Sequence, residues 1–367
     1  MPPAPLGAPP RIFVKRRRQD VLAKKRINLA LQGGGAHGAF TWGVLDRLLE
    51  EGDIEIAAIS GTSAGAMNGA ALKSGWIEGG AEGAREKLDW LWGKLGAVHD
   101  MRMTTWLAGL MPDTTDLLHT ALEYSLPFTF ADTVSRMSSP YAFGPFYQNP
   151  LRKIAEAFEY EKVCADAGPR LFVGATNVRT GRIRVFSGEE MSADVLLAST
   201  CLPTLFQAVD ILDPQTGQTE AFWDGGYTGN PALFPLFGKE FPDDILIVNI
   251  NPLERAEVPV TPQEIQNRIN EISFNSSLLR ELRVISYAQQ MRKTWDSNAD
   301  GMKNINIHMI ADDALMNELS ASTKVVPSPF LLVRLKQAGR AAAEGFLDAH
   351  KSDLNTRSSV DLNAMFL

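Results

Sequence analysis

Apolar residues along this chain form continuous runs and helical repeats that predict alternating strands and helices. Runs at residues 27–32, 54–60 and 245–250 are typical of strands buried on both faces of a sheet. Residues 39–49 carry apolar side chains at mixed helical spacings, and residues 64–74 are almost all small. Strand and helix therefore alternate with short connections, which predicts right-handed parallel crossovers and an α/β fold.

The second half of the chain predicts further elements of both kinds. Residues 171–176 and 183–186 flank a glycine turn and predict a hairpin. Residues 263–295 show a long helical pattern, residues 305–310 predict one more strand, and residues 331–347 predict an amphipathic helix. We therefore expect a mainly helical C-terminal region, either as a separate domain or as a completion of the first.

Charge divides the chain into regions. Residues 1–26 are rich in proline and carry a net charge of +7, whereas the rest of the chain sums to −14. We expect this tail to be disordered and solvated, and the alternative is an electrostatic contact between residues 11–26 and an anionic membrane. We assign residues 27–255 to the main α/β domain and residues 263–367 to the C-terminal region.

Composition narrows the class of protein. Hydrophobic residues make up 45% of the 367 residues and charged residues 22%, as in a soluble globular protein. No stretch approaches the roughly 18 uncharged apolar residues that suggest a membrane-spanning helix. The two cysteines fit a reducing compartment and offer no metal-site spacing. We therefore expect a cytoplasmic protein, peripheral membrane association being the alternative, with no cofactor, no metal and no nucleic acid partner, and we predict no oligomeric state.

A serine lies between two glycines directly after the strand predicted at 54–60. The sequence there is Gly61-Thr62-Ser63-Ala64-Gly65, and a helix of small residues follows. A serine in such a strand-to-helix turn is held in a sharp bend that exposes its hydroxyl at the top of a sheet. The turn therefore predicts Ser63 as a nucleophile, with Gly61 and Gly65 as the elbow that positions it.

A second glycine turn follows the first predicted strand. Gly33, Gly35 and Gly38 match the dinucleotide-binding pattern, which expects an acidic residue at the end of the second strand. Asp53 and Glu55 lie at the start of that strand instead, so nucleotide binding is disfavoured. A glycine-rich turn that opens a helix also points backbone N–H groups at negative charge, which suits an oxyanion hole.

A serine nucleophile needs a base, and the histidines of this chain are poor candidates. Among the five histidines, His308 falls within a predicted strand and His350 on a polar helix end, where such side chains are usually packed or solvated. Asp224 ends a short aromatic strand and precedes Gly225 and Gly226. That arrangement brings a carboxylate and bare backbone close to another group.

Four ordered blocks of this sequence resemble the patatin-like phospholipase family. They are residues 33–38, residues 61–65, residues 198–206 and residues 224–226, and the similarity covers about residues 27–250. The family pattern has a glycine-rich oxyanion loop, a serine elbow and an Asp-Gly-Gly or Asp-Gly-Ala acid, and it uses a Ser–Asp dyad with no catalytic histidine. The resemblance implies a three-layer α/β/α fold with a mainly parallel central sheet and a C-terminal helical extension.

The resemblance also implies roles for residues of this chain. Ser63 would be the nucleophile and Asp224 its base, with Gly225 and Gly226 supporting the acid loop. The oxyanion hole would be formed by the loop that contains Gly33, Gly34, Gly35 and Gly38, through the N–H groups of Gly34 and Gly35. One departure is His37, which stands where the family has Arg or Lys. We expect it to contact substrate.

The resulting hypothesis is a serine acyl hydrolase that cleaves carboxylic esters of lipids. It would be of the phospholipase A or lysophospholipase type, would work through an acyl-enzyme and would need no metal. Two alternatives stay open at this point. A lipid acyltransferase would use the same residues with an alcohol as acceptor, and a non-catalytic lipid- or nucleotide-binding protein would keep them without turnover.

Overall fold

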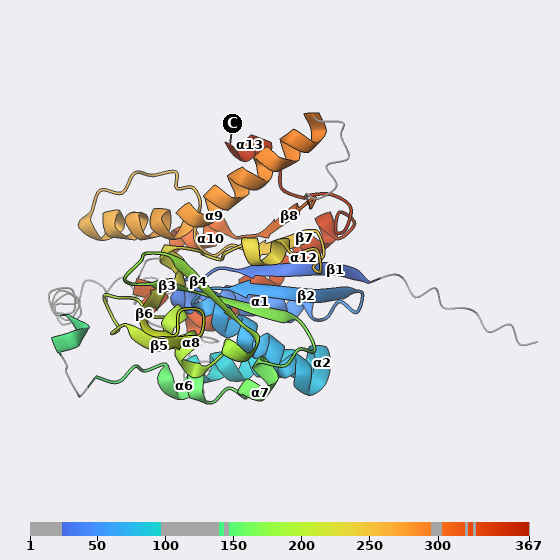
Figure 1. The fold of residues 1–367 in the computed structure, drawn as a ribbon. Helices are drawn as coiled ribbons and strands as arrows, with labels where there is room; N and C mark the ends of the chain where they lie inside the picture. The colour runs from blue at the N-terminus through green and yellow to red at the C-terminus, as the bar shows by residue number, and fades with distance from the viewer. Residues whose placement is uncertain are drawn as a thin grey trace, which may run out of the picture.

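The computed structural model describes residues 24–96, 139–142, 147–294, 303–319, 322–325 and 328–366. An eight-stranded sheet lies at its centre, in the order β5-β6-β3-β2-β1-β7-β8, with β4 paired to β3 (Figure 1). The pairs β1–β2, β1–β7, β2–β3 and β7–β8 are parallel, whereas β3–β4, β3–β6 and β5–β6 are antiparallel. The expected mainly parallel α/β sheet is confirmed.

The strands are β1 Lys25–Leu31, β2 Ile54–Gly61, β3 Arg170–Asn177, β4 Ile183–Ser187, β5 Val209–Asp213, β6 Gln218–Asp224, β7 Asp244–Val248 and β8 Asn306–Ile310. The α-helices are α1 Gly38–Leu48, α2 Ala64–Gly96, α6 Arg152–Glu156, α7 Tyr160–Val163, α8 Ala193–Ser199, α9 Pro262–Thr294, α10 Asp313–Glu318, α11 Ser322–Val325, α12 Pro329–His350 and α13 Leu362–Phe366. Short 3-10 turns are η1 Gly35–His37, η3 Gly188–Glu190, η4 Gly225–Tyr227 and η5 Phe234–Phe237. The N-terminal tail, expected to be disordered with membrane contact by residues 11–26 as the alternative, lies outside the described residues up to residue 23.

Helices cover both faces of the sheet and give each face its own hydrophobic core. In β7 the side chains alternate, so that Leu246 and Val248 join the core under α1, α2 and α12. Ile245 and Ile247 join the core under α9 and α13. This alternation explains why the strand is a continuous apolar run, since both of its faces are buried. Figure 1 shows α1 and α2 below the sheet and α9 and α13 above it, which is the expected three-layer arrangement.

The C-terminal residues add a strand and helices to this same sheet. β8 pairs with β7, and α12 packs against α1 at a close crossing. A Cβ at Gly43 would lie 1.9 Å from the carbonyl oxygen of Lys336, and one at Gly339 would lie 2.0 Å from that of Phe40. Glycine on both helices therefore allows the two backbones to approach this closely.

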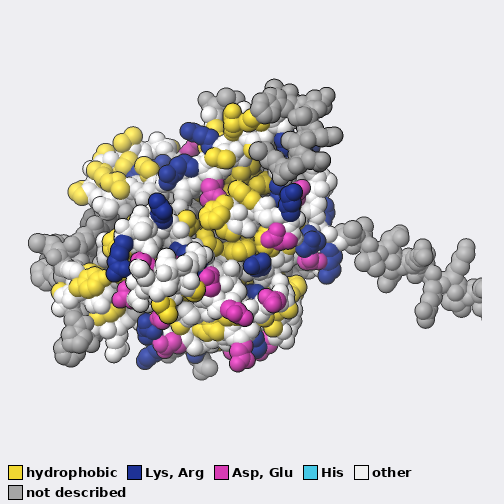
Figure 2. Space-filling model, in the orientation of Figure 1, with side chains coloured by type: hydrophobic (Ala, Val, Ile, Leu, Met, Phe, Trp, Pro, Cys, Tyr) yellow, Lys and Arg dark blue, Asp and Glu magenta, His cyan; other side chains and the backbone are white. Residues whose placement is uncertain are grey.

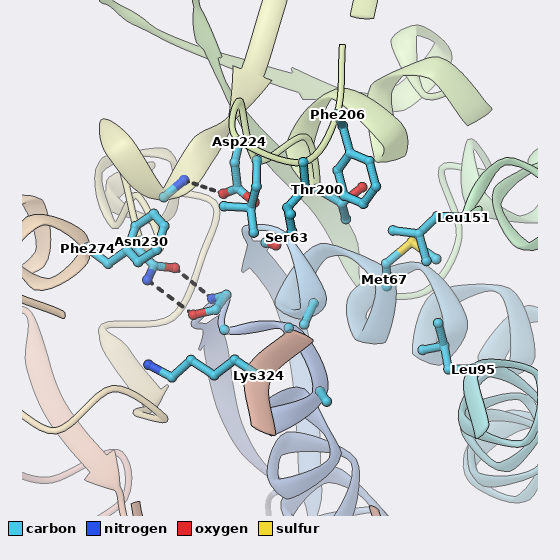
Figure 3. Close-up of a pocket in the computed structure, with 18 of the residues that line it drawn as sticks. Ser63, Met67, Leu95, Leu151, Thr200, Phe206, Asp224, Asn230, Phe274 and Lys324 are labelled. Carbon is cyan, nitrogen blue, oxygen red and sulfur yellow. Dashed lines mark hydrogen bonds between the residues drawn. The ribbon is translucent and has the colours of Figure 1, made fainter. Parts of the chain in front are cut away.

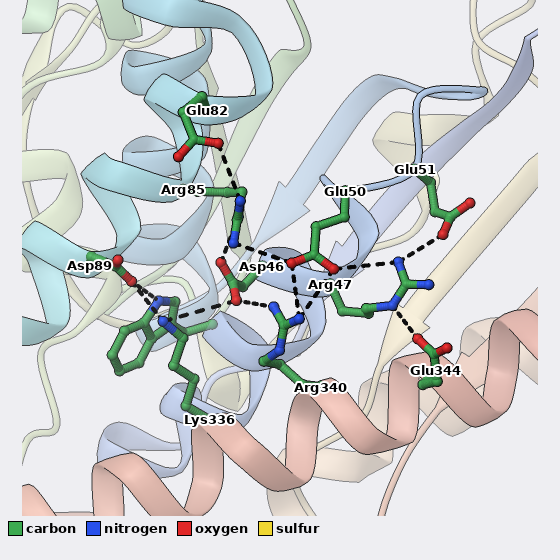
Figure 4. Close-up of polar contacts among 11 residues, drawn as sticks. Asp46, Arg47, Glu50, Glu51, Glu82, Arg85, Asp89, Lys336, Arg340 and Glu344 are labelled. Atoms are coloured by element: carbon green, nitrogen blue, oxygen red, sulfur yellow. Dashed lines mark hydrogen bonds and ion pairs between the residues drawn. The ribbon is translucent and has the colours of Figure 1, made fainter.

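An ion-pair network joins α12 to α1 and α2 (Figure 4). Arg340 of α12 and Arg85 of α2 both pair with Asp46 of α1. Arg47 pairs with Glu344 on α12 and, at 2.7 Å, with Glu51. Because several charges share partners in fixed positions, this network holds the helices together better than isolated surface pairs would.

One helix differs from its predicted form, and another exposes apolar side chains. The small-residue helix that begins at Ala64 continues to Gly96 and is interrupted at Gly79 and Gly80, which have non-helical backbone angles. Helix α9 exposes an apolar stripe on the side away from the core, formed by Ile265, Ile269 and Ile272, which are 43%, 53% and 55% exposed. Figure 2 shows apolar side chains gathered over α9 at the upper left of the view. No helix within the described ranges is long and apolar enough to span a membrane.

Candidate active site

The two glycine turns predicted from sequence meet at the carboxyl end of the parallel strands. β1 leads into the first turn and its neighbour β2 leads into the second, so both turns open at the same edge of the sheet. A cavity of about 370 Å³ lies there. Ser63, Asp224 and the loop 33–36 line it, together with apolar side chains from α2 and from the segments around residues 150 and 205 (Figure 3).

Ser63 has the backbone geometry of a nucleophile elbow. Its φ is +55°, a left-handed conformation that a residue other than glycine adopts only under constraint. Gly65 allows the bend, because a Cβ there would lie 2.1 Å from the carbonyl oxygen of Leu31. The N–H of Ser63 donates to Ser199 Oγ at 2.9 Å, and Ser199 Oγ donates to the Gly174 carbonyl at 2.7 Å. Ser199 thus ties the elbow to β3.

Asp224 lies beside Ser63 at the end of β6 and is 2% exposed. Burial raises the pKa of its carboxyl to about 7, although hydrogen bonds from the Gly226 N–H and from the Ser63 side chain lower it. The Gly226 N–H donates to Asp224 Oδ1 at 2.8 Å, and Figure 3 draws this bond. Gly225 packs against the Gly174 carbonyl, where a Cβ would come within 2.3 Å. A carboxylate with a pKa near 7 can accept a proton far better than an exposed one.

The four glycines of this loop differ in whether their backbone N–H groups already donate a hydrogen bond. The Gly33 N–H donates to Asn230 Oδ1 at 2.6 Å, and the Gly38 N–H donates to carbonyls within the turn. Among the described residues, no hydrogen bond uses the N–H groups of Gly34 or Gly35. Of these four glycines, Gly34 and Gly35 are therefore the two whose N–H groups remain available among the described residues.

His37 does not lie where a substrate contact would place it. It is 1% exposed, its Nε2 lies 2.7 Å from Thr323 Oγ1, and it is not among the residues that line the cavity. Burial, and then the positive charge of Lys324, hold its pKa well below the ordinary value, so the ring is neutral. The expectation that His37 contacts substrate has no support from this position.

Several residues of the site come from segments that the motifs did not indicate. Phe274 of α9 and Lys324 of α11 both line the cavity. Asn230 and Asn251 hold the Gly33 peptide, and Asn251 Nδ2 donates to the Gly33 carbonyl at 2.8 Å. Ser199 stood within the recognised block 198–206, so a search for polar residues there could have found it. The other four carry no local pattern.

The histidines were expected to be packed or solvated, and one of them resembles a triad member in its contacts. His308 Nε2 lies 2.9 Å from Asp244 Oδ1, and its Nδ1 lies 3.1 Å from Ser359 Oγ. The ring is fully buried, and none of the three residues lines the cavity. This group is therefore structural. Within the described ranges, no three His, Cys, Asp or Glu side chains are grouped so as to hold a metal ion.

The solved structures that match this chain include two bacterial proteins of low identity. The crystal structure of VipD from Legionella pneumophila is 18% identical, with a TM-score of 0.41, over 89% of this chain and 68% of that one. A chain from the structure of full-length SpcU in complex with full-length ExoU, from the type III secretion system of Pseudomonas aeruginosa, is 13% identical. Its TM-score is 0.27, over 88% of this chain and 53% of that one.

Comparison with curated proteins returns no match. Comparison with family models matches residues 29–237 to the patatin-like phospholipase model. That match begins in β1, includes both glycine turns and Asp224, and covers more than half of the chain. The protein therefore belongs to the patatin-like phospholipase family and is a hydrolase of lipid esters.

Proposed function

We propose that the protein is a phospholipase A or lysophospholipase that uses Ser63 and Asp224 as a catalytic dyad. The observation that carries this proposal is the interaction between the Ser63 side chain and a buried Asp224 carboxylate at one cavity. The apolar lining of that cavity suits an acyl chain, and includes Met67, Leu95, Leu151, Ile154, Leu205 and Phe206.

In the first half of the reaction, Asp224 takes the proton of the Ser63 hydroxyl as Ser63 Oγ attacks the ester carbonyl. The N–H groups of Gly34 and Gly35 stabilise the tetrahedral oxyanion, and each such donor contributes about 2.7–4 kcal/mol in well-studied enzymes. When the C–O bond breaks, the protonated Asp224 returns a proton to the leaving alcohol. The acyl group stays on Ser63 as an ester.

In the second half, water attacks the acyl-enzyme. Asp224 accepts a proton from that water, the same two amides stabilise the second oxyanion, and the fatty acid leaves as Ser63 Oγ regains its proton. The pKa of about 7 makes Asp224 suited to both steps, because it can accept and return a proton near neutral pH. An alcohol in place of this water would make the enzyme an acyltransferase.

The test is to incubate the protein with vesicles of a diacyl phospholipid and, separately, with a lysophospholipid. We expect free fatty acid from one or both substrates, and no product with Ser63→Ala. A product in which the acyl chain has moved to an added alcohol would assign acyl transfer instead. Absence of any product with the wild-type protein, or undiminished product with Ser63→Ala, would contradict the proposal.

A further inference from the structure

The cavity has an apolar side and a polar side, with Ser63 between them. Leu95, Leu151 and Ile154 line the apolar side. Figure 3 shows the amine of Lys324 on the other side of Ser63, the side on which Asn230 and Phe274 also lie. A cavity built this way can orient an amphiphile, because its acyl chain and its head would occupy different sides of the reacting serine.

Within the residues that the structure describes, the amine of Lys324 lacks an anionic partner. Its Nζ donates to Asn251 Oδ1 at 3.0 Å, and no carboxylate of the described residues forms an ion pair with it. A lysine amine has three donors, so this neutral amide leaves donors available. Half-buried cations without an ion partner carry a desolvation cost, and a methionine at this position would avoid that cost.

The carboxylate that acts to raise the pKa of Lys324 already forms ion pairs with two arginines. Glu271 of α9 pairs with Arg255 at 2.7 Å and with Arg268 at 3.4 Å. Three cations therefore surround one carboxylate next to the cavity. Burial lowers the pKa of Lys324 to about 8, Glu271 acting to raise it and Arg255 to lower it. The amine is still mostly protonated at pH 7.

The position of Lys324 relative to the reaction centre is fixed by its backbone. The Lys324 carbonyl oxygen packs on Gly35, where a Cβ would come within 2.1 Å of it. Gly35 has a φ of +59°, so this loop conformation also favours glycine. Helix α11 therefore lies against the loop whose amides face the oxyanion, and its lysine side chain lines the same cavity as Ser63.

We propose that Lys324 binds the phosphate of a phospholipid head group and so makes the enzyme selective for ester substrates that carry a phosphate. This inference rests on the proposed function, because it assumes ester cleavage at Ser63. Lysine is a common phosphate ligand in proteins. His37 cannot supply this charge, since its ring is neutral and faces Thr323. The C-terminal region would thus supply the charge that recognises the head group.

The test compares two substrates that differ only in the phosphate: a lysophosphatidic acid and the monoacylglycerol with the same acyl chain, both in micelles of a neutral detergent. Lys324→Met should lower kcat/KM for the lysophosphatidic acid by about 10–100-fold, mainly through KM, the loss expected for a charged hydrogen bond. Activity on the monoacylglycerol should change less than threefold. Lys324→Arg should keep most of the selectivity.

Lys303→Met is the matched control. Lys303 is another half-buried lysine whose pKa is lowered by burial. Its Nζ donates to the carbonyls of Leu236 and Gly238, and it does not line the cavity. It should leave the substrate ratio unchanged. Equal losses on both substrates with Lys324→Met would overturn the proposal and indicate that the amine supports the glycine loop through Asn251.

A pH series gives a readout that a structural role would not change. The wild-type preference for the lysophosphatidic acid should fall between pH 7 and pH 9, as Lys324 loses its proton, and should stay flat in Lys324→Met. The ratio of the two activities cancels the titration of Asp224, which acts on both substrates. Glu271 and Arg255 face Lys324 and keep their charges over this range, and His37 stays neutral. A flat wild-type ratio would contradict the assignment.

A binding measurement separates this inference from the proposed function. Calorimetric titration of Ser63→Ala with the same lysophosphatidic acid should show binding that is weakened about 10–100-fold by adding Lys324→Met. Loss of binding with Lys324→Met would support the inference even if the wild-type protein cleaved neither substrate. Lys324-dependent binding of inorganic phosphate without any effect on the lipid would assign the site to free phosphate and overturn it.

Discussion

Two buried aspartates lie at opposite edges of the central sheet, and their surroundings act on them in opposite ways. Asp224 lies at the carboxyl edge, and burial raises its pKa to about 7. The few hydrogen bonds that it accepts lower the pKa but do not offset burial. Asp244, at the start of β7, is 1% exposed. Burial acts to raise its pKa too, but hydrogen bonds from His308, Asn355 and Asn306 outweigh burial and lower it.

The same contrast extends to the neighbours of each aspartate. The Asp244 carboxylate accepts hydrogen bonds from Asn306 Nδ2 and from the Asn355 N–H, and His308 is held between Asp244 and Ser359. Around Asp224 the serine backbone is constrained, two amides have no partner among the described residues, and a lysine lacks an anion. Buried polar groups with full sets of partners stabilise a fold, whereas groups left without them are typical of sites that bind or react.

The largest expected difference between the two regions is in turnover. Asp224→Asn should lower kcat on a chromogenic ester by about 10⁴-fold, the scale seen when a catalytic acid of a triad is removed. His308→Ala should change kcat by less than about threefold, because His308 does not line the cavity. If His308→Ala abolished turnover while Asp224→Asn kept it, the roles of the two regions would be reversed.

For stability we expect the opposite order, with the larger effect from the region around Asp244. His308→Ala should lower the free energy of unfolding by about 1–3 kcal/mol at pH 7, because it removes one hydrogen-bond partner of the buried Asp244 carboxylate. Chemical denaturation followed by circular dichroism would measure this. Ser286→Ala is a control, since Ser286 is a buried serine bonded to Asn363 outside this cluster. A loss no larger than the control's would show that His308 is not a stabilising partner.

The free energy of unfolding should depend on pH in opposite directions through Asp224 and Asp244. Because its folded pKa is raised to about 7 from about 3.9 in the unfolded chain, stability should fall as pH rises from about 4 to 7, by up to about 4 kcal/mol. Asp224→Asn should remove this loss and raise the melting temperature at pH 8. The lowered pKa of Asp244 acts the other way: its contribution is present above the unfolded pKa and is lost as pH falls through the folded one. Equal melting temperatures of wild type and Asp224→Asn at pH 8 would argue against a perturbed Asp224.

The smallest expected effect concerns the tie between the elbow and β3. Ser199→Ala removes the acceptor for the Ser63 N–H and should lower kcat by about fivefold, in line with a hydrogen bond of about 1 kcal/mol. KM should change little, because Ser199 does not line the cavity. Steady-state kinetics on the chromogenic ester would measure both. An unchanged kcat would show that the elbow holds its bend without Ser199.

Local patterns predicted the parts of the site that follow directly from strands. The runs at 27–32 and 54–60 and their glycine turns have a backbone requirement that sequence reveals, because only small residues fit such bends. The edge strand β5 was missed because it is short and half exposed. The main α/β region and its family were therefore predictable from these motifs.

The contributions of the C-terminal region were not predictable in this way. Phe274 packs on Gly226, 48 residues earlier in the chain, and Lys324 packs on Gly35, 289 residues earlier. Neither residue has a local pattern, since the determinant is long-range packing. His37 illustrates the same point, because its contact with Thr323 of α11 keeps it from lining the cavity. Whether residues 263–367 can fold apart from the sheet stays a prediction to test.

The most direct test of the account is the rate at which a fluorophosphonate probe modifies Ser63, followed by peptide mass spectrometry across pH 5–9. We predict a single adduct on Ser63, formed at a rate that rises with pH through about 7 as Asp224 loses its proton, and slowed strongly in Asp224→Asn. An adduct on Ser359, or labelling of Ser63 at a rate indifferent to Asp224, would contradict the claim that these two residues act together.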